Sequence, residues 1–243
     1  MSDEIGLVFV HGAGEDGRVW ERQLATFGGS RKALAVDLPG RAGRRDEAPF
    51  TSHDDNARDV LAKMDEAGIR RAVVVGHSMG GAVALTIALR HPDRLAGLVL
   101  VVTGARLRMN PEFLEKAKQQ ASSAQAEPPV PLERTVAASV KPEVLEWIRP
   151  RAMSAPPKTI YADFQANNAF DVMERLGEVA VPTLVVAADE DRMAPPKFSQ
   201  FMADKIPGAR MVTLVGSGHY PQVEQQERFD AELAQFVAGL EKR

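Results

Sequence analysis

Short apolar runs alternate with longer stretches of helical periodicity over the first hundred residues of the chain. Residues 5–10 and 95–103 are apolar at nearly every position, the pattern of strands that a parallel sheet buries on both faces. Residues 52–67 instead repeat apolar side chains at helical spacing, with Ala57, Val60 and Met64 on one stripe. The alternation predicts an α/β fold with a mostly parallel sheet and helices on both of its faces.

The same patterns locate further elements along the chain. Strands are expected at residues 5–10, 33–36, 72–75, 95–103, 182–188 and 210–215. Helices are expected between them at residues 19–27, 52–67, 80–89, 195–206 and 225–240. The sequence therefore predicts a sheet of about six strands.

The region between residues 106 and 179 lacks any run typical of a strand. It contains helical stretches separated by prolines, at residues 111–125, 132–140, 142–148 and 159–167. Because a strand pattern resumes at residue 182, we interpret residues 106–179 as a helical cap inserted into a core of residues 1–105 and 180–243.

The hexapeptide GHSMGG at residues 76–81 stands between an expected strand and an expected helix. A G-x-S-x-G sequence in this context predicts a strained turn that exposes the hydroxyl of Ser78. Gly80 and Gly81 would let the helix approach the strand closely where the turn is sharpest.

A serine hydroxyl becomes a good nucleophile when a histidine takes its proton and a carboxylate orients that histidine. Asp191 follows the strand expected at residues 182–188, and His219 follows the next one. Because parallel strands end at the same edge of a sheet, we expect Ser78, Asp191 and His219 to meet there.

These motifs, together with HGAG at residues 11–14 and DLPG at residues 37–40, resemble those of the α/β-hydrolase family. The similarity spans nearly the whole chain and is greatest to its small capped branch of carboxylesterases, enol-lactonases, perhydrolases and carbon–carbon bond hydrolases. It implies a Ser78, Asp191, His219 triad and an oxyanion hole made by the N–H groups of Ala13 and Met79.

The acid of this site is left open between two residues, and the other histidines need a separate interpretation. The family usually has glycine where this chain has Ala188, so Asp189 is an alternative to Asp191. By the same resemblance, His11 and His77 are expected to support the turns mainly as structural residues. His53 is expected at the surface, at the end of a helix.

The expected cap carries the large apolar side chains that would shape a substrate pocket. Each of them could instead pack the cap onto the sheet. The candidates for substrate binding are Trp147, Phe164 and Phe170, and Tyr220 beside His219.

Composition removes several other classes of function. The net charge is −3 and no Lys/Arg block is long enough to follow a phosphate backbone, so we expect no nucleic-acid partner. Arg41, Arg44 and Arg45 are interpreted as solvated loop charges.

The chain has no cysteine and no histidine–carboxylate grouping with metal-ligand spacing, so we expect no metal and no cofactor. An acidic start, and no apolar run of roughly 20 residues, predict a cytoplasmic protein without membrane contact. The oligomeric state is not indicated.

We therefore expect an enzyme, a serine hydrolase that cleaves a small, largely apolar carboxylic ester or lactone through an acyl-enzyme. Two alternatives stay open. A carbon–carbon bond hydrolase of aromatic catabolism would need cations such as Arg106, Arg108 or Lys158 to hold a carboxylate. A receptor-like protein would keep the fold and triad without catalysis.

Overall fold

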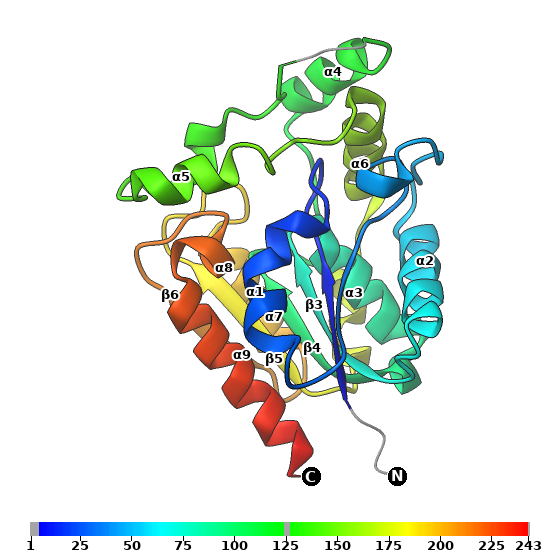
Figure 1. Cartoon of the computed structure of the whole chain (residues 1–243), viewed down its shortest axis with the longest axis vertical. Helices are drawn as coiled ribbons and strands as arrows, with labels where there is room; N and C mark the ends of the chain where they lie inside the picture. The colour runs from blue at the N-terminus through cyan, green and yellow to red at the C-terminus, as the bar shows by residue number, and fades with distance from the viewer. Residues whose placement is uncertain (1–4, 124–126, 243) are drawn as a thin grey trace.

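Six parallel strands form the centre of the molecule in a computed structural model that describes residues 5–123 and 127–242 (Figure 1). Within these residues the strand order is β2-β1-β3-β4-β5-β6, and every neighbouring pair is parallel. The strands are β1 (Gly6–Val10), β2 (Ala33–Val36), β3 (Ala72–His77), β4 (Leu95–Val101), β5 (Thr183–Ala188) and β6 (Arg210–Leu214). The parallel sheet predicted from the apolar runs is confirmed.

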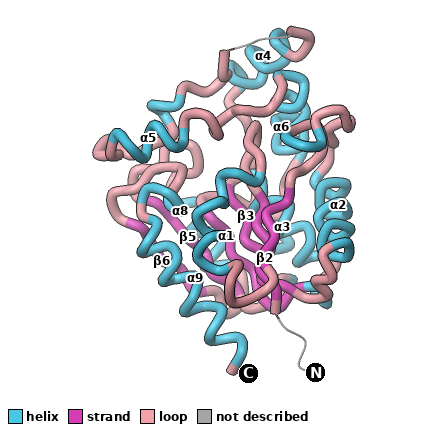
Figure 2. Tube along the Cα trace, viewed as in Figure 1, coloured by secondary structure: helices cyan, strands magenta, loops and turns pink. Residues whose placement is uncertain are grey.

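Helices cover both faces of this sheet (Figure 2). The α-helices are α1 (Glu21–Phe27), α2 (His53–Glu66), α3 (Met79–Arg90), α4 (Pro111–Gln120), α5 (Pro142–Ile148), α6 (Pro157–Ala169), α7 (Pro196–Lys205), α8 (Pro221–Glu224) and α9 (Gln226–Glu241). The 3-10 helices are η1 (Gly17–Trp20), η2 (Ala42–Arg44), η3 (Pro92–Arg94), η4 (Leu132–Arg134) and η5 (Met173–Glu178). None of the described helices combines the length and the apolar character needed to cross a membrane.

The alternating side chains of each central strand enter two separate cores. In β1, Leu7 and Phe9 pack on the side of α1 and α9, whereas Val8 and Val10 pack on the side of α2 and α3. All four side chains are fully buried. Burial on both faces explains why these strands appear in the sequence as continuous apolar runs.

The segment between β4 and β5, residues 106–179, lies over the carboxyl edge of the sheet (Figure 1). We call it the helical segment; its treatment as a separate cap stays a prediction. The helix expected at residues 111–125 ends at Gln120, and residues 124–125 lie outside the described part of the chain.

The helix expected at residues 132–140 is wrong, because only the short η4 forms there. Two backbone N–H groups beyond η4 donate to carboxylates of the core instead of to helical carbonyls. Ala137 donates to Glu224 Oε2 at 2.8 Å, and Ala138 donates to Glu190 Oε2 at 2.8 Å. Because these N–H groups bind side-chain carboxylates, the helix does not continue, and the chain is held against α8 and the loop after β5.

His53 begins α2 as expected, but its ring is buried rather than at the surface. Its Nε2 lies 3.1 Å from Asn167 Oδ1 on α6, and its ring packs edge-on against Phe170. Burial lowers the pKa of His53 to about 4, so the ring is neutral near pH 7. The residue belongs to the contact between α2 and the helical segment.

Candidate functional site

Ser78 occupies a strained turn between β3 and α3. Its backbone angles are φ 50° and ψ −115°, outside the regions that a side chain normally permits. A Cβ on Gly76 would lie 2.2 Å from Gly80 O, and one on Gly80 would lie 2.2 Å from Val10 O. Only glycine fits at these two positions, so the sequence of the turn fixes how closely strand and helix approach.

The backbone on both sides of this turn is anchored to β4 and the residues after it. The N–H of Ser78 donates to Val101 O at 2.9 Å, and the hydroxyl of Thr103 donates to Ser78 O at 2.7 Å. The Ser78 side chain is half-buried and lines a cavity between the sheet edge and the helical segment. A nucleophile in this position would be rigidly held and open to a ligand.

His219 and Asp191 form a hydrogen-bonded pair at the same edge. His219 Nδ1 lies 2.8 Å from Asp191 Oδ2, and both side chains are nearly buried. The other carboxylate oxygen of Asp191 accepts from the N–H groups of Met193 at 2.7 Å and Ala194 at 3.1 Å. This fixes the tautomer of His219, because Nδ1 donates to the carboxylate and Nε2 is left as the acceptor.

His219 lines the cavity together with Ser78. Within the described residues no hydrogen bond joins the Ser78 hydroxyl to the imidazole. Such bonds are often long in a free enzyme and shorten when the substrate binds. The structure thus brings the three predicted residues to one edge of the cavity. Of the two hydrogen bonds expected between them, the one between His219 and Asp191 is formed.

Charge and burial act against each other at this pair. Burial lowers the pKa of His219, but the adjacent Asp191 carboxylate outweighs it and raises that pKa above its usual value. Burial likewise raises the pKa of Asp191, and the charge and hydrogen bonds of its partners lower it below the ordinary range. Asp191 is therefore an anion near pH 7, able to stabilise a protonated imidazole.

Asp189, the alternative acid, points elsewhere. It is exposed, and its Oδ1 accepts from Gly216 N at 2.7 Å and from Ser217 N at 3.4 Å. These bonds hold the turn after β6, which carries His219. The geometry favours Asp191 as the partner of the imidazole and gives Asp189 a structural place in the neighbouring turn.

The loop after β1 leaves one N–H group open beside the cavity. Gly12 N donates to Glu15 Oε2 at 2.7 Å and Gly14 N donates to Asp163 Oδ2 at 2.8 Å, whereas the N–H of Ala13 between them has no acceptor among the described residues. Ala13 lines the cavity. Met79 starts α3, where the first N–H groups have no intrahelical partner. The positions of the Ala13 and Met79 N–H groups are thus compatible with the predicted oxyanion hole.

Glu15 is a buried carboxylate at this site that the sequence reasoning missed. Its Oε2 lies 3.1 Å from His77 Nδ1, and His77 Nε2 donates to His219 O at 2.7 Å. Burial raises the pKa of Glu15, but the charge of His77 outweighs it and lowers that pKa below the ordinary value. One feature of the sequence could have indicated this role. Glu15 lies three residues after Gly12, a spacing at which a carboxylate can accept from the backbone N–H of the earlier residue.

The Glu15–His77 contact links the loops after β1, β3 and β6. Tyr220 packs its ring 5.4 Å from that of His77, and burial followed by the charge of Glu15 raises the pKa of Tyr220 well above its usual value. His77 therefore supports the backbone of His219 directly, in keeping with its expected structural role.

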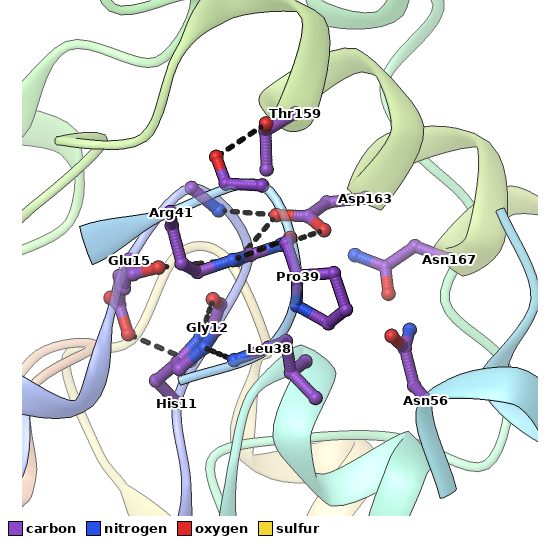
Figure 3. A network of polar contacts seen from close by, with 12 residues as sticks. His11, Gly12, Glu15, Leu38, Pro39, Arg41, Asn56, Thr159, Asp163 and Asn167 are labelled. Carbon is purple, nitrogen blue, oxygen red and sulfur yellow. Dashed lines mark hydrogen bonds and ion pairs between the residues drawn. The ribbon is translucent and has the colours of Figure 1, made fainter. Parts of the chain in front are cut away.

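The helical segment contacts the loops after β1 and β2 through the buried carboxylate of Asp163 (Figure 3). Arg41 and Asp163 make two hydrogen bonds, of 3.0 and 2.8 Å, with both side chains almost fully buried. Asp163 also accepts from Gly14, and Thr159 donates to Gly40 O at 2.9 Å. The interpretation of Arg41 as a solvated charge is wrong, because α6 supplies a carboxylate that its position in the sequence does not reveal.

Beneath this network, His11 is held as a neutral ring (Figure 3). Its Nδ1 donates to Gly12 O at 2.8 Å and its Nε2 accepts from Leu38 N at 3.3 Å. Burial, followed by the charge of Arg41, lowers the pKa of His11. The ring therefore connects the two motifs that follow β1 and β2.

Removing one member of the buried pair has a large expected effect on stability. Arg41→Met leaves the Asp163 charge buried without its partner, which costs about 3–5 kcal/mol. The double variant Arg41→Met/Asp163→Asn removes that charge and keeps an acceptor for Gly14, so it recovers more than half of the loss. Urea unfolding monitored by circular dichroism measures both variants.

The control for this prediction is an exposed pair. Arg210 and Glu232 lie 2.7 Å apart with both side chains partly solvated, so Arg210→Met costs less than about 1 kcal/mol. An Arg41→Met variant no less stable than Arg210→Met would show that the buried pair does not fasten the helical segment to the core.

Glu224 on α8 fastens the helical segment to the loop of His219. Its Oε2 accepts from Ala137 N at 2.8 Å and Gly218 N at 3.1 Å, and its Oε1 accepts from Tyr220 N at 3.0 Å. Burial raises the pKa of this carboxyl group. The N–H of His219 donates to Thr135 O at 2.6 Å. The helical segment therefore contacts the backbone of the candidate base itself.

The cavity has a volume of about 650 Å³ and lies between these loops and the helical segment. Of the aromatic residues expected there, Phe164 and Tyr220 line it. Trp147 and Phe170 are not among its lining residues, which corrects the expectation that these two side chains shape the pocket. No set of three or more His, Cys, Asp or Glu side chains in the described ranges is placed to hold a metal ion.

Contacts outside the cavity explain where Trp147 and Phe170 lie. The Trp147 ring stacks against two guanidinium groups, with Arg151 Cζ at 3.9 Å and Arg22 Cζ at 4.7 Å from its centroid. Phe170 turns toward His53 and packs in the core beside α2 and α3. Both side chains therefore fasten the helical segment to the core.

Comparisons with known proteins identify the family of the chain. A model of the alpha/beta hydrolase family matches residues 7–232. The chain is 27% identical to the pimeloyl-acyl-carrier-protein methyl ester esterase of Neisseria meningitidis, over 99% of this chain and 79% of that protein.

Solved structures show the same similarity. A thermophilic esterase from Thermogutta terrifontis superposes with a TM-score of 0.87 at 29% identity, covering 97% of this chain and 90% of the other. The enol-lactonase from Burkholderia xenovorans superposes with a TM-score of 0.85 at 27% identity, covering 98% and 92%. The predicted fold and the prediction of a hydrolase enzyme are confirmed, and the chain belongs to the alpha/beta hydrolase family.

Proposed function

We propose that this hydrolase cleaves small carboxylic esters or lactones through an acyl-enzyme on Ser78. The observation that carries the proposal is the His219–Asp191 hydrogen bond of 2.8 Å at the cavity that Ser78 lines. A serine hydroxyl needs a neutral imidazole, held in one tautomer by a carboxylate, to be activated near pH 7.

The first half of the reaction forms the acyl-enzyme. Ser78 Oγ attacks the carbonyl carbon while His219 Nε2 takes the hydroxyl proton, and Asp191 stabilises the imidazolium that results. The N–H groups of Ala13 and Met79 donate to the oxyanion of the tetrahedral intermediate. His219 then returns the proton to the leaving oxygen, and the alcohol departs.

The second half releases the acid. Water gives a proton to His219 and attacks the acyl carbon, and the collapse of the second tetrahedral intermediate restores the Ser78 hydroxyl. Because the same two backbone donors serve both intermediates, the rigid contacts around Ala13 support each step.

A small molecule is the proposed substrate, bound between the sheet edge and a cap made by the helical segment. Apolar side chains such as Met109, Phe113 and Phe164 line the cavity and suit an apolar acyl or alcohol group. The similarity to an esterase and to an enol-lactonase supports esters and lactones as the substrate class.

A second candidate, carbon–carbon bond hydrolysis, is favoured by one observation. Arg106 and Arg108 both line the cavity, where a dienoate carboxylate would need cations. Lys158, the third cation expected for that role, is not among the lining residues. The same triad would act on a vinylogous diketone with a carbon leaving group.

Turnover of a substrate panel tests the proposal. We expect the purified protein to hydrolyse p-nitrophenyl esters of short acids or simple lactones faster than vinylogous diketones. Dominant activity on the diketones would replace the esterase proposal with carbon–carbon bond hydrolysis. No turnover of any panel member and no labelling by a fluorophosphonate would contradict catalysis and favour a receptor-like protein.

A further inference from the structure

The cavity of Ser78 is lined by an excess of positive charge over negative charge. Five cationic side chains line it: Arg106, Arg108, Arg134, Arg192 and Lys197, which we call the cationic rim. All of them are exposed residues. Among the described residues that line the cavity, Glu15 is the single carboxylate, and it is buried and bonded to Gly12 and His77.

The composition of the chain does not account for this excess. The sequence has 30 Lys and Arg residues against 33 Asp and Glu residues, a net charge of −3. A cavity that sampled the surface evenly would carry similar numbers of each sign. Instead five cations converge on one cavity from three separate parts of the chain.

Three members of the cationic rim have no carboxylate partner within residues 5–123 and 127–242: Arg134, Arg192 and Lys197. Arg134 Cζ lies 5.8 Å from the centroid of the Phe113 ring, and Lys197 Nζ lies 5.8 Å from the centroid of the Phe198 ring. Their charges are therefore available to a ligand.

The other two members are weakly engaged. Arg106 lies 3.8 Å from Asp171, with both side chains largely solvated, and Arg108 donates to Asn168 O at 2.6 Å. A carbonyl leaves the charge of Arg108 uncompensated, and an exposed ion pair of that length contributes little. Both guanidinium groups can add to the positive potential of the cavity.

Two of the three rim segments are neighbours in space. A Cβ on Gly104, just before Arg106, would lie 3.4 Å from Phe198 Cδ2, so the chain after β4 contacts the start of α7. That helix begins at Pro196 with no acidic residue in its first turn, and its N-terminal dipole adds to the positive charge there. Apolar side chains such as Leu107 and Met193 line the same cavity beside the cations.

We propose that the preferred substrate carries, besides the ester or lactone group, an anionic carboxylate or phosphate that the cationic rim holds. This inference rests on the proposed ester hydrolysis at Ser78 and narrows its substrate class. The apolar lining receives the carbon chain, and the planar fork of an arginine suits either anion. Clefts of one charge also attract substrates of the opposite charge and raise association rates by about 10- to 10³-fold.

Matched pairs of methyl esters test the inference. One member is the monomethyl ester of a straight-chain dicarboxylic acid, and the other replaces the free carboxylate with a methyl group. We expect kcat/KM from methanol release to favour the anionic member by about 10-fold at low ionic strength. The preference should fall steeply when salt increases from about 20 mM to about 0.5 M, because salt screens exposed charges. A third ester with a terminal phosphate shows which anion is preferred.

Charge removal on the cationic rim supplies the second arm. We expect the triple variant Arg134→Gln/Arg192→Gln/Lys197→Gln to lower the anionic-to-neutral ratio of kcat/KM by about 10-fold. Arg228→Gln on α9 is the matched control, since Arg228 is exposed, lacks a carboxylate partner among the described residues and does not line the cavity. It should keep the wild-type ratio.

The outcomes separate this inference from the proposed function. Hydrolysis of both esters without preference, or equal losses on both in the triple variant, overturns the anionic subsite and leaves ester hydrolysis standing. If the wild type cleaves neither ester nor any other of the panel, the proposed function fails. In that case, calorimetry measures the affinities of the Ser78→Ala variant for a dicarboxylate and for a monocarboxylate, which tests the anionic subsite independently of catalysis. Equal affinities for the two compounds overturn the subsite.

Discussion

Replacing Ser78 with alanine lowers kcat for ester hydrolysis by roughly 10⁴- to 10⁶-fold. The reaction needs a nucleophile at this position, and water cannot replace a hydroxyl held on the turn between β3 and α3. The substitution should leave the fold intact, because the backbone contacts to Val101 and Thr103 are kept and the Ser78 hydroxyl has no hydrogen-bond partner among the described residues. Steady-state turnover of a p-nitrophenyl ester measures the loss.

Ser199→Ala is the matched control. Ser199 on α7 is fully buried, its hydroxyl has no hydrogen-bond partner in the described part of the chain, and it does not line the cavity. Its removal should leave kcat within about 2-fold of the wild type, since surrounding packing changes little. Full turnover by a well-folded Ser78→Ala protein would refute the assignment of the nucleophile.

Asp191→Asn lowers kcat by roughly 10⁴-fold, whereas Asp189→Asn changes it by less than about 10-fold. An asparagine amide can donate to His219 Nδ1 and so favour the tautomer in which Nε2 carries the proton, which cannot act as a base. Within the part of the chain that the structure describes, the Asp189 carboxylate accepts hydrogen bonds only from backbone N–H groups of the turn after β6. Equal losses in both variants, or a larger loss in Asp189→Asn, would show that the observed pairing is not the catalytic one.

The pH profile of the same variant has a predicted direction. Neutral His219 is the active form, so kcat/KM falls as the pH decreases through the pKa of this ring. Burial lowers that pKa and Asp191 raises it, with a net increase in the wild type. Removing the carboxylate charge lowers the pKa, so the acid limb of the residual activity in Asp191→Asn should move to lower pH.

The sheet and the three candidate catalytic residues could be predicted because each depends on local patterns. Continuous apolar runs mark buried parallel strands, and Ser78, Asp191 and His219 each follow directly after one of them. Parallel pairing then places the three loops at one edge of the sheet. No contact between distant residues had to be known for this step.

The contacts that support His219, the candidate base, could not be predicted in that way. Glu15 and the carbonyl of His219 come from two loops and His77 from the end of β3, and these positions are separated by 62 and 142 residues along the chain. Only the folded sheet brings them together. A single sequence shows Glu15 as one more charge in a polar turn.

The helical segment shows where side-chain preference alone misleads. Residues 132–140 have helical periodicity, yet the core carboxylates Glu190 and Glu224 bind their N–H groups and end the helix after Arg134. Trp147 appears suited to a pocket, but its ring stacks against Arg22 from the distant helix α1, as well as against the nearby Arg151. Tertiary contacts override local propensity at both places.

Mass spectrometry of the protein after reaction with a fluorophosphonate tests the central claim most directly, because the reagent bonds to an activated serine. We predict one adduct per chain on the peptide that contains Ser78, absent in Ser78→Ala and formed much more slowly in His219→Ala. An adduct on another residue, or ester turnover by a protein that acquires no adduct, would contradict an acyl-enzyme on Ser78.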